Sequence, residues 1–378
     1  MKFLLFSLSC GGGHDAAANA AAAALRNTGA EAEVYDCYAV IRPSLSKAVC
    51  GGYVWLVKHL PWLFGFFYNA SYNIPRLNGK TFVYDINKLE IKRLARFIEK
   101  EKPDAIITSH IFSAQQLTHL KRLGKIDQWI AGIITDYDVQ PFWNDTEIDM
   151  IFTPTESLSE AYRKFGVNGA ELQATGIPVD PSIRPESDIV KAKEEAGLDP
   201  KRKHVLVAGG SMGAGKMPST VEALLRSLDE NVQIIVVCGS NKKLKRKFAR
   251  MNIPESRMKV EGFVKPLYKL MRACDVVISK PGGLSTTEAF ELKRPLVVVH
   301  PIQGVESHNA RFLKENSIAL CPKNDEEVAL YVSELLNQPE KAKSMLEARE
   351  RIVPSGAAES IARRVIEETK KRMQEKGN

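Results

Sequence analysis

The strongest constraint in this sequence is the alternation of short apolar runs with helical patterns along nearly the whole chain. Such alternation is typical of parallel sheets built from β–α–β units, whose strands are buried on both faces. A first series of predicted strands is 2–9, 32–35, 105–108, 130–135, 150–153 and 171–175. A second series is 204–208, 232–238, 258–260, 275–279, 296–299 and 318–320. The sequence therefore predicts an α/β protein with two doubly wound halves.

A proline-rich stretch separates the two series. Residues 176–187 (GIPVDPSIRPES) hold three prolines and little apolar periodicity, as interdomain linkers do. We expect one Rossmann-like domain over 1–176, a linker over 177–187 and a second Rossmann-like domain over 188–356. The segment 357–378 is predicted to form a basic helix that packs on either half, including back on the amino-terminal domain. Ligands of such folds bind at the carboxyl ends of the strands, so the expected site is the cleft between two facing halves.

Composition and cysteine spacing restrict the class of protein. Hydrophobic residues at 44% and charged residues at 26% are ordinary globular values, and the net charge of +8 suits an anionic partner such as a nucleotide, a membrane surface or a nucleic acid. The longest apolar stretch, 49–68, is interrupted by Lys58, His59 and Pro61, so no membrane-spanning helix is expected. The six cysteines contain no CxxC pair, which predicts reduced thiols in a cytoplasmic protein and no zinc site.

One stretch is unusually aromatic. Residues 53–72 hold eight aromatic side chains in twenty positions. We expect this stretch to lie at a lipid interface or around an apolar acceptor, and the alternative is a buried aromatic core cluster. The candidate acceptor and membrane residues are Trp55, Trp62, Phe64, Phe66, Phe67 and Tyr68.

A glycine-rich turn follows the first predicted strand. Gly11-Gly12-Gly13-His14 opens an alanine-rich helix, whose positive end favours a neutral imidazole at His14 that can act as a general base. The alternative is a histidine that caps the helix or faces solvent. Gly11-x-Gly13-x-x-Ala16 followed by Asp36 also resembles a dinucleotide fingerprint, which keeps an NAD-dependent dehydrogenase open as a remote alternative.

Three further motifs follow predicted strands. Residues 210–216 match a phosphate-binding loop up to Met217, where the metal-binding hydroxyl is missing, yet a backbone cradle for phosphate remains. Asp136 ends a strand of the first half, without the carboxylates that a metal site would need. Residues 279–288 (SKPGGLSTTE) open a helix whose free N–H groups suit a pyrophosphate. Ser285 and Glu288 form either a capping box or a ribose-binding pair.

The stretch 241–250 (NKKLKRKFAR) holds six basic residues. We interpret it as a solvated helix face, with attraction to anionic lipid as a second reading. No motif supports nucleic-acid binding.

These motifs together resemble a known family. The patterns are SxGGGHxAA at 9–17, TDxxxxxxW at 135–143, GGSMGAGK at 209–216, EGF at 261–263, KPGGLSxxEA at 280–289 and GxExxNA at 304–310. They are similar to those of the monogalactosyldiacylglycerol synthases and processive diacylglycerol glucosyltransferases, relatives of the peptidoglycan lipid N-acetylglucosaminyltransferase. Two positions differ, because the family usually has histidine at Gln140 and glutamine at Val305.

The resemblance implies a GT-B fold and a role for each matched residue. His14 would be the catalytic base, and a UDP-sugar would bind the second half. Asp136 is a second catalytic candidate because it stands at the carboxyl end of a predicted strand, and the alternative is an ordinary turn carboxylate. The resemblance places phosphates at Met212 and Gly213, uracil at Phe263 and Val264, pyrophosphate at Leu284 and Ser285, ribose at Glu288, and hexose near Glu306 and Asn309. The candidate donor-binding residues also include Gly13, Ser211, Lys280, Pro281, Gly282 and Gly283.

The expected activity is transfer of glucose or galactose from a UDP-sugar to diacylglycerol, with inversion and with no metal or other cofactor. The enzyme would be a peripheral 1,2-diacylglycerol 3-glycosyltransferase at the cytoplasmic face of the cell membrane, attracted by anionic lipid and not by nucleic acid. The alternative within the fold is a glycosyltransferase that acts on another lipid or on a soluble acceptor.

Overall fold

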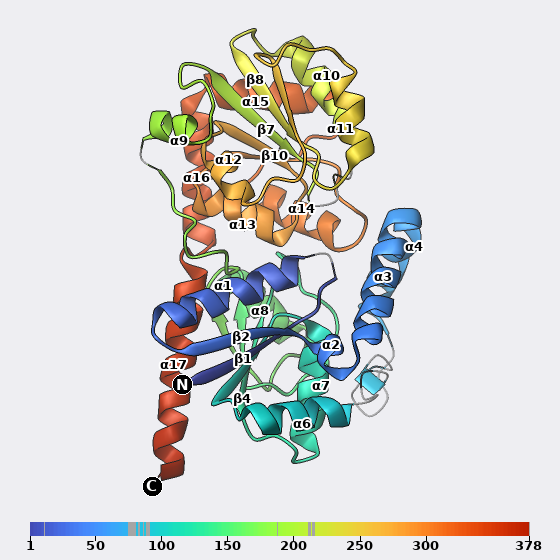
Figure 1. Ribbon diagram of the computed structural model, residues 1–378, viewed down its shortest axis with the longest axis vertical. Coiled ribbons are helices and arrows are strands. Elements are labelled where there is room, and N and C mark those ends of the chain that lie inside the picture. The colour runs from blue at the N-terminus through green and yellow to red at the C-terminus, as the bar shows by residue number, and fades with distance from the viewer. Residues whose placement is uncertain are drawn as a thin grey trace. The chain divides into compact units, whose positions relative to one another are not determined.

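The computed structural model describes residues 1–10, 12–74, 81, 84–85, 87, 91–186, 188–210, 213 and 216–377. The chain forms two compact units (Figure 1). Unit 1 comprises Met1–Ser182, Ile302–Val305 and Val353–Asn378, and unit 2 comprises Ile183–Pro301 and Glu306–Ile352. Each unit contains one sheet and its own hydrophobic core.

The sheet of unit 1 has six parallel strands in the order β2-β1-β3-β4-β5-β6. The strands are β1 (Lys2–Ser7), β2 (Glu31–Asp36), β3 (Ala105–Thr108), β4 (Trp129–Ile133), β5 (Met150–Thr153) and β6 (Glu171–Ala174). All six strands of the first predicted series are confirmed, with small differences at their ends.

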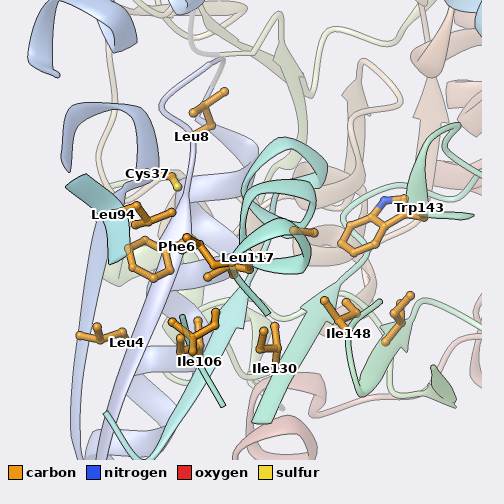
Figure 2. Packing of buried hydrophobic residues seen from close by; sticks show 14 of the residues in the cluster. Leu4, Phe6, Leu8, Cys37, Leu94, Ile106, Leu117, Ile130, Trp143 and Ile148 are labelled. Carbon is orange, nitrogen blue, oxygen red and sulfur yellow. The ribbon is translucent and has the colours of Figure 1, made fainter. Parts of the chain in front are cut away.

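Both faces of this sheet are buried. Along β1, Leu4 and Phe6 point to one face, where Figure 2 shows them beside Ile106 of β3, with Ile130 of β4 beyond it. Phe3 and Leu5 belong to the cluster on the other face. This two-sided burial explains why the strand is a continuous apolar run and does not alternate between apolar and polar residues.

Helices cover the two faces of the unit 1 sheet. The alanine-rich α1 (Gly13–Asn27) and α17 (Ala357–Gly377) pack together in one cluster, to which α17 contributes Ala358, Ile361, Ala362 and Val365. The opposite cluster includes side chains of α2 (Cys37–Ile41), α6 (Ile91–Glu101), α7 (Ile111–Arg122) and α8 (Glu156–Lys164), together with Trp143 of the 3-10 turn Trp143–Asp145. Two more helices, α3 (Pro43–His59) and α4 (Pro61–Ser71), stand beside the sheet, away from α17 (Figure 1).

The basic face of α17 is paired with carboxylates of unit 1. Arg364 contacts Glu171 at 2.9 Å, and Arg372 contacts Asp149 at 3.1 Å. Two basic side chains of α17 therefore help to attach the helix to unit 1. Among the described residues, no helix is long and apolar enough to cross a bilayer.

The sheet of unit 2 has five parallel strands in the order β11-β10-β7-β8-β9. The strands are β7 (Lys203–Ala208), β8 (Val232–Val237), β9 (Met258–Glu261), β10 (Val276–Ser279) and β11 (Leu296–Val298). The helices are α9 (Ile189–Glu195), α10 (Met217–Ser227), α11 (Lys242–Ala249), α12 (Leu267–Arg272), α13 (Gly283–Glu291), α14 (Val305–Glu315), α15 (Asp325–Asn337) and α16 (Pro339–Ile352). The α/β fold with two parallel sheets is confirmed.

The prediction of a strand at 318–320 was wrong. Only a single bridge joins Leu320 to Val297 of β11, so the segment does not extend the ladder. A short apolar run next to an edge strand can be buried by packing alone, and its composition does not show how many ladder hydrogen bonds it makes.

The expectation that all cysteines are reduced was also wrong. Cys10 and Cys50 form a disulfide that joins the loop after β1 to the middle of α3, with 4.7 Å between their Cα atoms. The two residues are 40 positions apart, so spacing within the sequence did not reveal their proximity. Cys37, Cys238, Cys274 and Cys321 are free thiols.

Candidate active site

Strand order brings three polar turns to one edge of the unit 1 sheet. β1, β3 and β4 are neighbours, and all three are parallel. His14 follows β1, His110 follows β3, and Thr135 follows β4. Because the carboxyl ends of parallel strands share one edge, His14 meets the other two side chains although both are about a hundred residues away in sequence.

His14 is held in one tautomer by the turn after β3. Its Nδ1 lies 2.7 Å from the backbone oxygen of Ser109 and 3.1 Å from the hydroxyl oxygen of Thr135. A carbonyl oxygen can only accept a hydrogen bond, so Nδ1 carries the proton and donates it. The Ser109 hydroxyl in turn donates to the backbone oxygen of His14 at 2.9 Å. In this tautomer the lone pair lies on Nε2, as a general base requires.

Gly13 is the first residue of α1, and the residue before it takes a backbone conformation that suits only glycine well. Gly12 is the N-cap, with φ of 86°, and no side chain caps the helix. The start of α1 therefore presents backbone N–H groups beside His14, which is half-buried.

A second histidine packs on the first. The rings of His14 and His110 meet edge to face, with centroids 4.5 Å apart. His110 is buried, and its Nδ1 accepts a hydrogen bond from the Phe112 backbone N–H at 3.1 Å, which fixes the opposite tautomer to that of His14. Burial, and secondarily the neighbouring His14, lower the pKa of His110 well below its ordinary value. The ring of His110 is therefore uncharged near neutral pH and does not compete with His14 for a proton.

Asp136 lies next to Thr135 and is bridged to the core by Gln140. The amide of Gln140 donates to Asp136 Oδ2, and its oxygen accepts from the indole nitrogen of the buried Trp143 at 3.4 Å. The hydroxyl of Thr135 lies 3.5 Å from the same carboxylate oxygen. Gln140, which stands where the family usually has histidine, is thus a support for Asp136.

The aromatic segment forms α3, α4 and the residue after α4, and much of it faces solvent. The exposed fractions of Trp62, Phe66 and Phe67 on α4 are 61%, 64% and 58%. Trp55 on α3 is also exposed, whereas Phe64 and Tyr68 are half-buried. The segment therefore does not form a buried aromatic cluster. We call the exposed side chains Trp55, Trp62, Phe66 and Phe67 the aromatic surface.

In unit 2, a tight turn follows β7. Gly213 has φ of 56°, and a Cβ there would lie 2.0 Å from the backbone oxygen of Cys238. The backbone oxygen of Gly213 accepts from the Asn241 side chain at 3.1 Å, which ties the turn to the start of α11. Ser211 and Met212 lie outside the described residues.

The turn after β10, the neighbour of β7, leads into α13. This helix begins at Gly283 with Gly282 as N-cap and with no side-chain cap, so Ser285 lies inside the first turn and the predicted capping box is absent. The Ser285 hydroxyl instead donates to the Gly282 backbone oxygen at 3.3 Å. The uncapped N–H groups, flanked by Leu284, form the kind of terminus that binds phosphate. Glu288 is half-buried one turn further along α13.

Two residues of α14 support this turn. Lys280 Nζ lies 3.7 Å from Glu306 Oε2, and both side chains are largely buried. The buried amide of Asn309 donates to the backbone oxygen of Pro281 at 2.9 Å. Asn309 therefore supports the turn between β10 and α13.

The remaining predicted donor residues lie after β9. Phe263 is 62% exposed, and it precedes Val264 in the connection to α12. A hollow of about 460 Å³ lies at the opposite edge of the unit 2 sheet, near Lys203 and Asp275, and contains none of the predicted site residues. Within the described ranges, no three potential metal ligands cluster.

Several residues of this site were not predicted from the sequence, namely Ser109, His110, Thr135, Asp138 and Tyr72. Thr135 and Asp138 lie within the pattern quoted for 135–143, and Tyr72 ends the aromatic stretch 53–72. The others have no local signal, because their contact with the site depends on strand order.

Comparisons with known proteins agree with these observations. Residues 14–179 match the monogalactosyldiacylglycerol (MGDG) synthase family, and residues 204–365 match the glycosyltransferase family 28 C-terminal domain. A processive diacylglycerol beta-glucosyltransferase of Bacillus pumilus is 28% identical over 320 residues, covering 80% of this chain and 82% of the relative. A probable chloroplastic monogalactosyldiacylglycerol synthase of Glycine max is 30% identical over 349 residues, covering 88% of this chain and 64% of the relative.

Solved structures are similar in fold. The crystal structure of Acinetobacter baumannii MurG has a TM-score of 0.62 at 17% identity, covering 96% of this chain and 98% of that one. An S. aureus MnaA co-structure with UDP has a TM-score of 0.60 at 15% identity, covering 99% and 97%. At these identities the likeness concerns the fold, and the predicted GT-B architecture is confirmed.

Proposed function

Because this chain is a glycosyltransferase of the diacylglycerol glycosyltransferase group, we propose that it transfers glucose or galactose from a UDP-sugar to diacylglycerol with inversion. The main observation in support is the tautomer of His14. Its Nδ1–H is committed to the Ser109 carbonyl, so Nε2 is the atom that can accept a proton. We place the reaction at the carboxyl ends of the parallel strands, where ligands bind in this fold class.

In the proposed reaction, His14 Nε2 removes the proton from the free hydroxyl of diacylglycerol. The hydroxyl oxygen then attacks the anomeric carbon from the face opposite UDP, the bond to the UDP oxygen breaks, and the configuration inverts. Thr135 and Ser109 keep the ring in orientation during proton transfer. The uncharged His110 behind the ring avoids repulsion when His14 becomes an imidazolium.

The donor would bind unit 2. The uncapped start of α13 supports the placement of the pyrophosphate there, since free N–H groups and the helix dipole favour negative charge that develops on the departing UDP. Lys280 lies at the same turn and would add a positive charge. Gly213, Phe263, Val264 and Glu288 remain proposed contacts of the nucleotide, and Glu306 with Asn309 of the hexose, with no metal or other cofactor required.

The acceptor would reach the site from a membrane. The aromatic surface is exposed, apolar and carried by the same unit as His14, which supports a peripheral position on a membrane. The basic helix α11 would add attraction to anionic lipid, because its lysines and arginines are exposed and only Phe248 is buried.

The test is release of UDP by the purified protein on phosphatidylglycerol vesicles that carry diacylglycerol, with UDP-glucose and UDP-galactose compared. We expect lipid-dependent release with one of the two donors and a product whose anomeric configuration, read by NMR, is opposite to that of the donor. His14→Ala should remove turnover and leave UDP binding intact, whereas His119→Ala, on α7 outside the site, should change neither. Retained configuration, or full turnover in His14→Ala, would contradict the mechanism.

Membrane binding is tested separately by vesicle flotation. Replacing Trp62, Phe66 and Phe67 by serine should weaken binding roughly 10- to 100-fold, because each aromatic side chain contributes buried apolar area. The matched control replaces three exposed apolar residues elsewhere, Leu123, Leu330 and Met373. Equal binding of the two triple variants would favour a soluble acceptor.

A further inference from the structure

Two tyrosines at the end of α4 form a hydrogen-bonded cluster with Asp138. The proposed mechanism does not use this cluster. The hydroxyl of Tyr72, the residue after α4, donates to Asp138 Oδ2, and the hydroxyl of Tyr68 lies 3.4 Å from the same oxygen. The two phenol oxygens are 3.5 Å apart. Burial, and then Tyr72 and Asp138, raise the pKa of Tyr68, so this phenol keeps its proton and stays a donor to the carboxylate.

Asp138 belongs to the same short turn as the groups around His14. It is three residues from Thr135, whose hydroxyl oxygen lies 3.1 Å from His14 Nδ1. It is two residues from Asp136, which accepts from Gln140. A displacement of Asp138 can therefore shift Thr135, the hydrogen-bond partner of the proposed base His14, through only three residues of backbone.

The backbone of this turn is held in place by Tyr162. The hydroxyl of the fully buried Tyr162 donates to the backbone oxygen of Asp138 at 3.2 Å and accepts from the backbone N–H of Gln140 at 2.9 Å. With Tyr162 fixed in the core, the side chain of Asp138 is the part of the turn that connects to α4. The contact joins elements 66 residues apart in sequence.

The outer side of α4 carries most of the aromatic surface. Phe66 and Phe67 stand within one helical turn of Tyr68, and they are exposed while Tyr68 is half-buried. The short helix therefore has a lipid-facing side and a side tied to Asp138. The loop that precedes His14 is tied to the neighbouring helix α3 through Cys10 and Cys50.

We propose that Asp138 is a positioning residue that couples the seating of α4 on a lipid surface to the orientation of His14 and Thr135. The proposal rests on the proposed function, because it assumes that the aromatic surface meets the membrane that holds the acceptor. A carboxylate suits this task, since one oxygen accepts from two phenols through charge-assisted hydrogen bonds. Neutral amides or an apolar contact would hold α4 less tightly.

The test compares Asp138→Asn and Tyr72→Phe with Tyr35→Phe. Tyr35 donates to Glu33 on β2, so the control removes a tyrosine–carboxylate hydrogen bond of the same unit outside the site. With vesicles of phosphatidylcholine and phosphatidylglycerol that carry diacylglycerol, we expect kcat of both site variants to fall roughly 10- to 100-fold, the scale of a small misplacement of a catalytic group. Vesicle binding, the affinity for UDP and the KM for the UDP-sugar should be unchanged, a split that general destabilisation would not give.

A second measurement does not depend on turnover. Hydrogen exchange of the backbone amides of 135–140 should slow when wild-type protein binds the same vesicles, and this protection should be lost in Asp138→Asn and kept in Tyr35→Phe. Unchanged kcat in the site variants, or equal protection in all proteins, would overturn the proposal. If wild-type protein transfers no sugar to diacylglycerol, the proposed function fails, and hydrogen exchange alone decides whether Asp138 couples α4 to the turn.

Discussion

Removal of the Cys10–Cys50 disulfide should destabilise unit 1 by an amount that follows from its position in the chain. The perturbation is the double substitution Cys10→Ser and Cys50→Ser, which leaves no unpaired thiol at either end of the bridge. Both cysteines are only partly buried, so loss of packing contributes little. The main effect is on the unfolded chain, which gains the freedom of an open loop.

The magnitude depends on the 40-residue separation of the two cysteines. The loop-closure relation for a ring of that size gives about 4 kcal/mol at 25 °C, most of it from the logarithm of the loop length. This is a large share of the stability of an ordinary domain, which is roughly 5 to 15 kcal/mol. The substitution is therefore expected to shift the urea midpoint clearly while the native fold is retained.

Tryptophan fluorescence isolates the unit concerned. All four tryptophans, Trp55, Trp62, Trp129 and Trp143, lie in unit 1, and the last two are buried in its core. Urea unfolding followed by fluorescence should show the loss in the double variant, and wild-type protein in reductant should match it. Reductant should leave the double variant unchanged, because its remaining cysteines are free thiols.

Thiol counting gives the refuting result. Wild-type protein unfolded without reductant should expose four reactive thiols, and six after reduction. Six thiols before reduction would show that the bridge is absent. Four thiols with no change in the urea midpoint would instead refute the loop-entropy reasoning.

Three other changes test packing, the nucleotide turn and pH dependence. Gly132→Ala would place a Cβ 2.6 Å from the buried ring of Trp143, so it should destabilise unit 1 by about 1 to 3 kcal/mol in the fluorescence assay. Gly213→Ala would bring a Cβ to 2.0 Å from the Cys238 backbone oxygen at a positive φ, so UDP affinity by calorimetry should fall at least roughly tenfold, with tryptophan-monitored unfolding unchanged. Burial lowers the pKa of His204 to about 4, so the unfolded chain binds a proton below roughly pH 6.5 that the folded chain does not. Stability of unit 2 should thus be constant above that pH and fall by up to about 3 kcal/mol towards pH 4, and His204→Leu should flatten this part of the curve in circular dichroism.

The strands were predictable because each is a continuous apolar run that is buried on two faces. In β1, Phe3 and Leu5 pack against one layer of helices. Leu4 and Phe6 pack against the other layer, so successive positions of the strand must all be apolar. The segment at 318–320 has the same composition, yet it forms a single bridge, because hydrogen-bond pairing depends on the neighbouring strand and not on its own residues.

The site was only partly predictable, for a related reason. A glycine-rich turn at a strand end indicated His14 locally, whereas its partners Ser109 and Thr135 lie 95 and 121 residues away and depend on the order β1-β3-β4. The Asp138 contact with Tyr72 also joins distant elements. Sequence periodicity predicts which residues are buried, but it does not rank the possible orders of the strands.

The return of α17 to unit 1 has a consequence for synthesis of the protein. The alanine face of α1 is made within the first thirty residues, but the side chains that cover it, such as Ile361 and Val365, are translated after the whole of unit 2. On the ribosome, the apolar face of α1 therefore stays uncovered by α17 while more than three hundred residues are added. A nascent chain stalled before residue 357 would keep that face open to chaperones, and its release would depend on the arrival of one late helix.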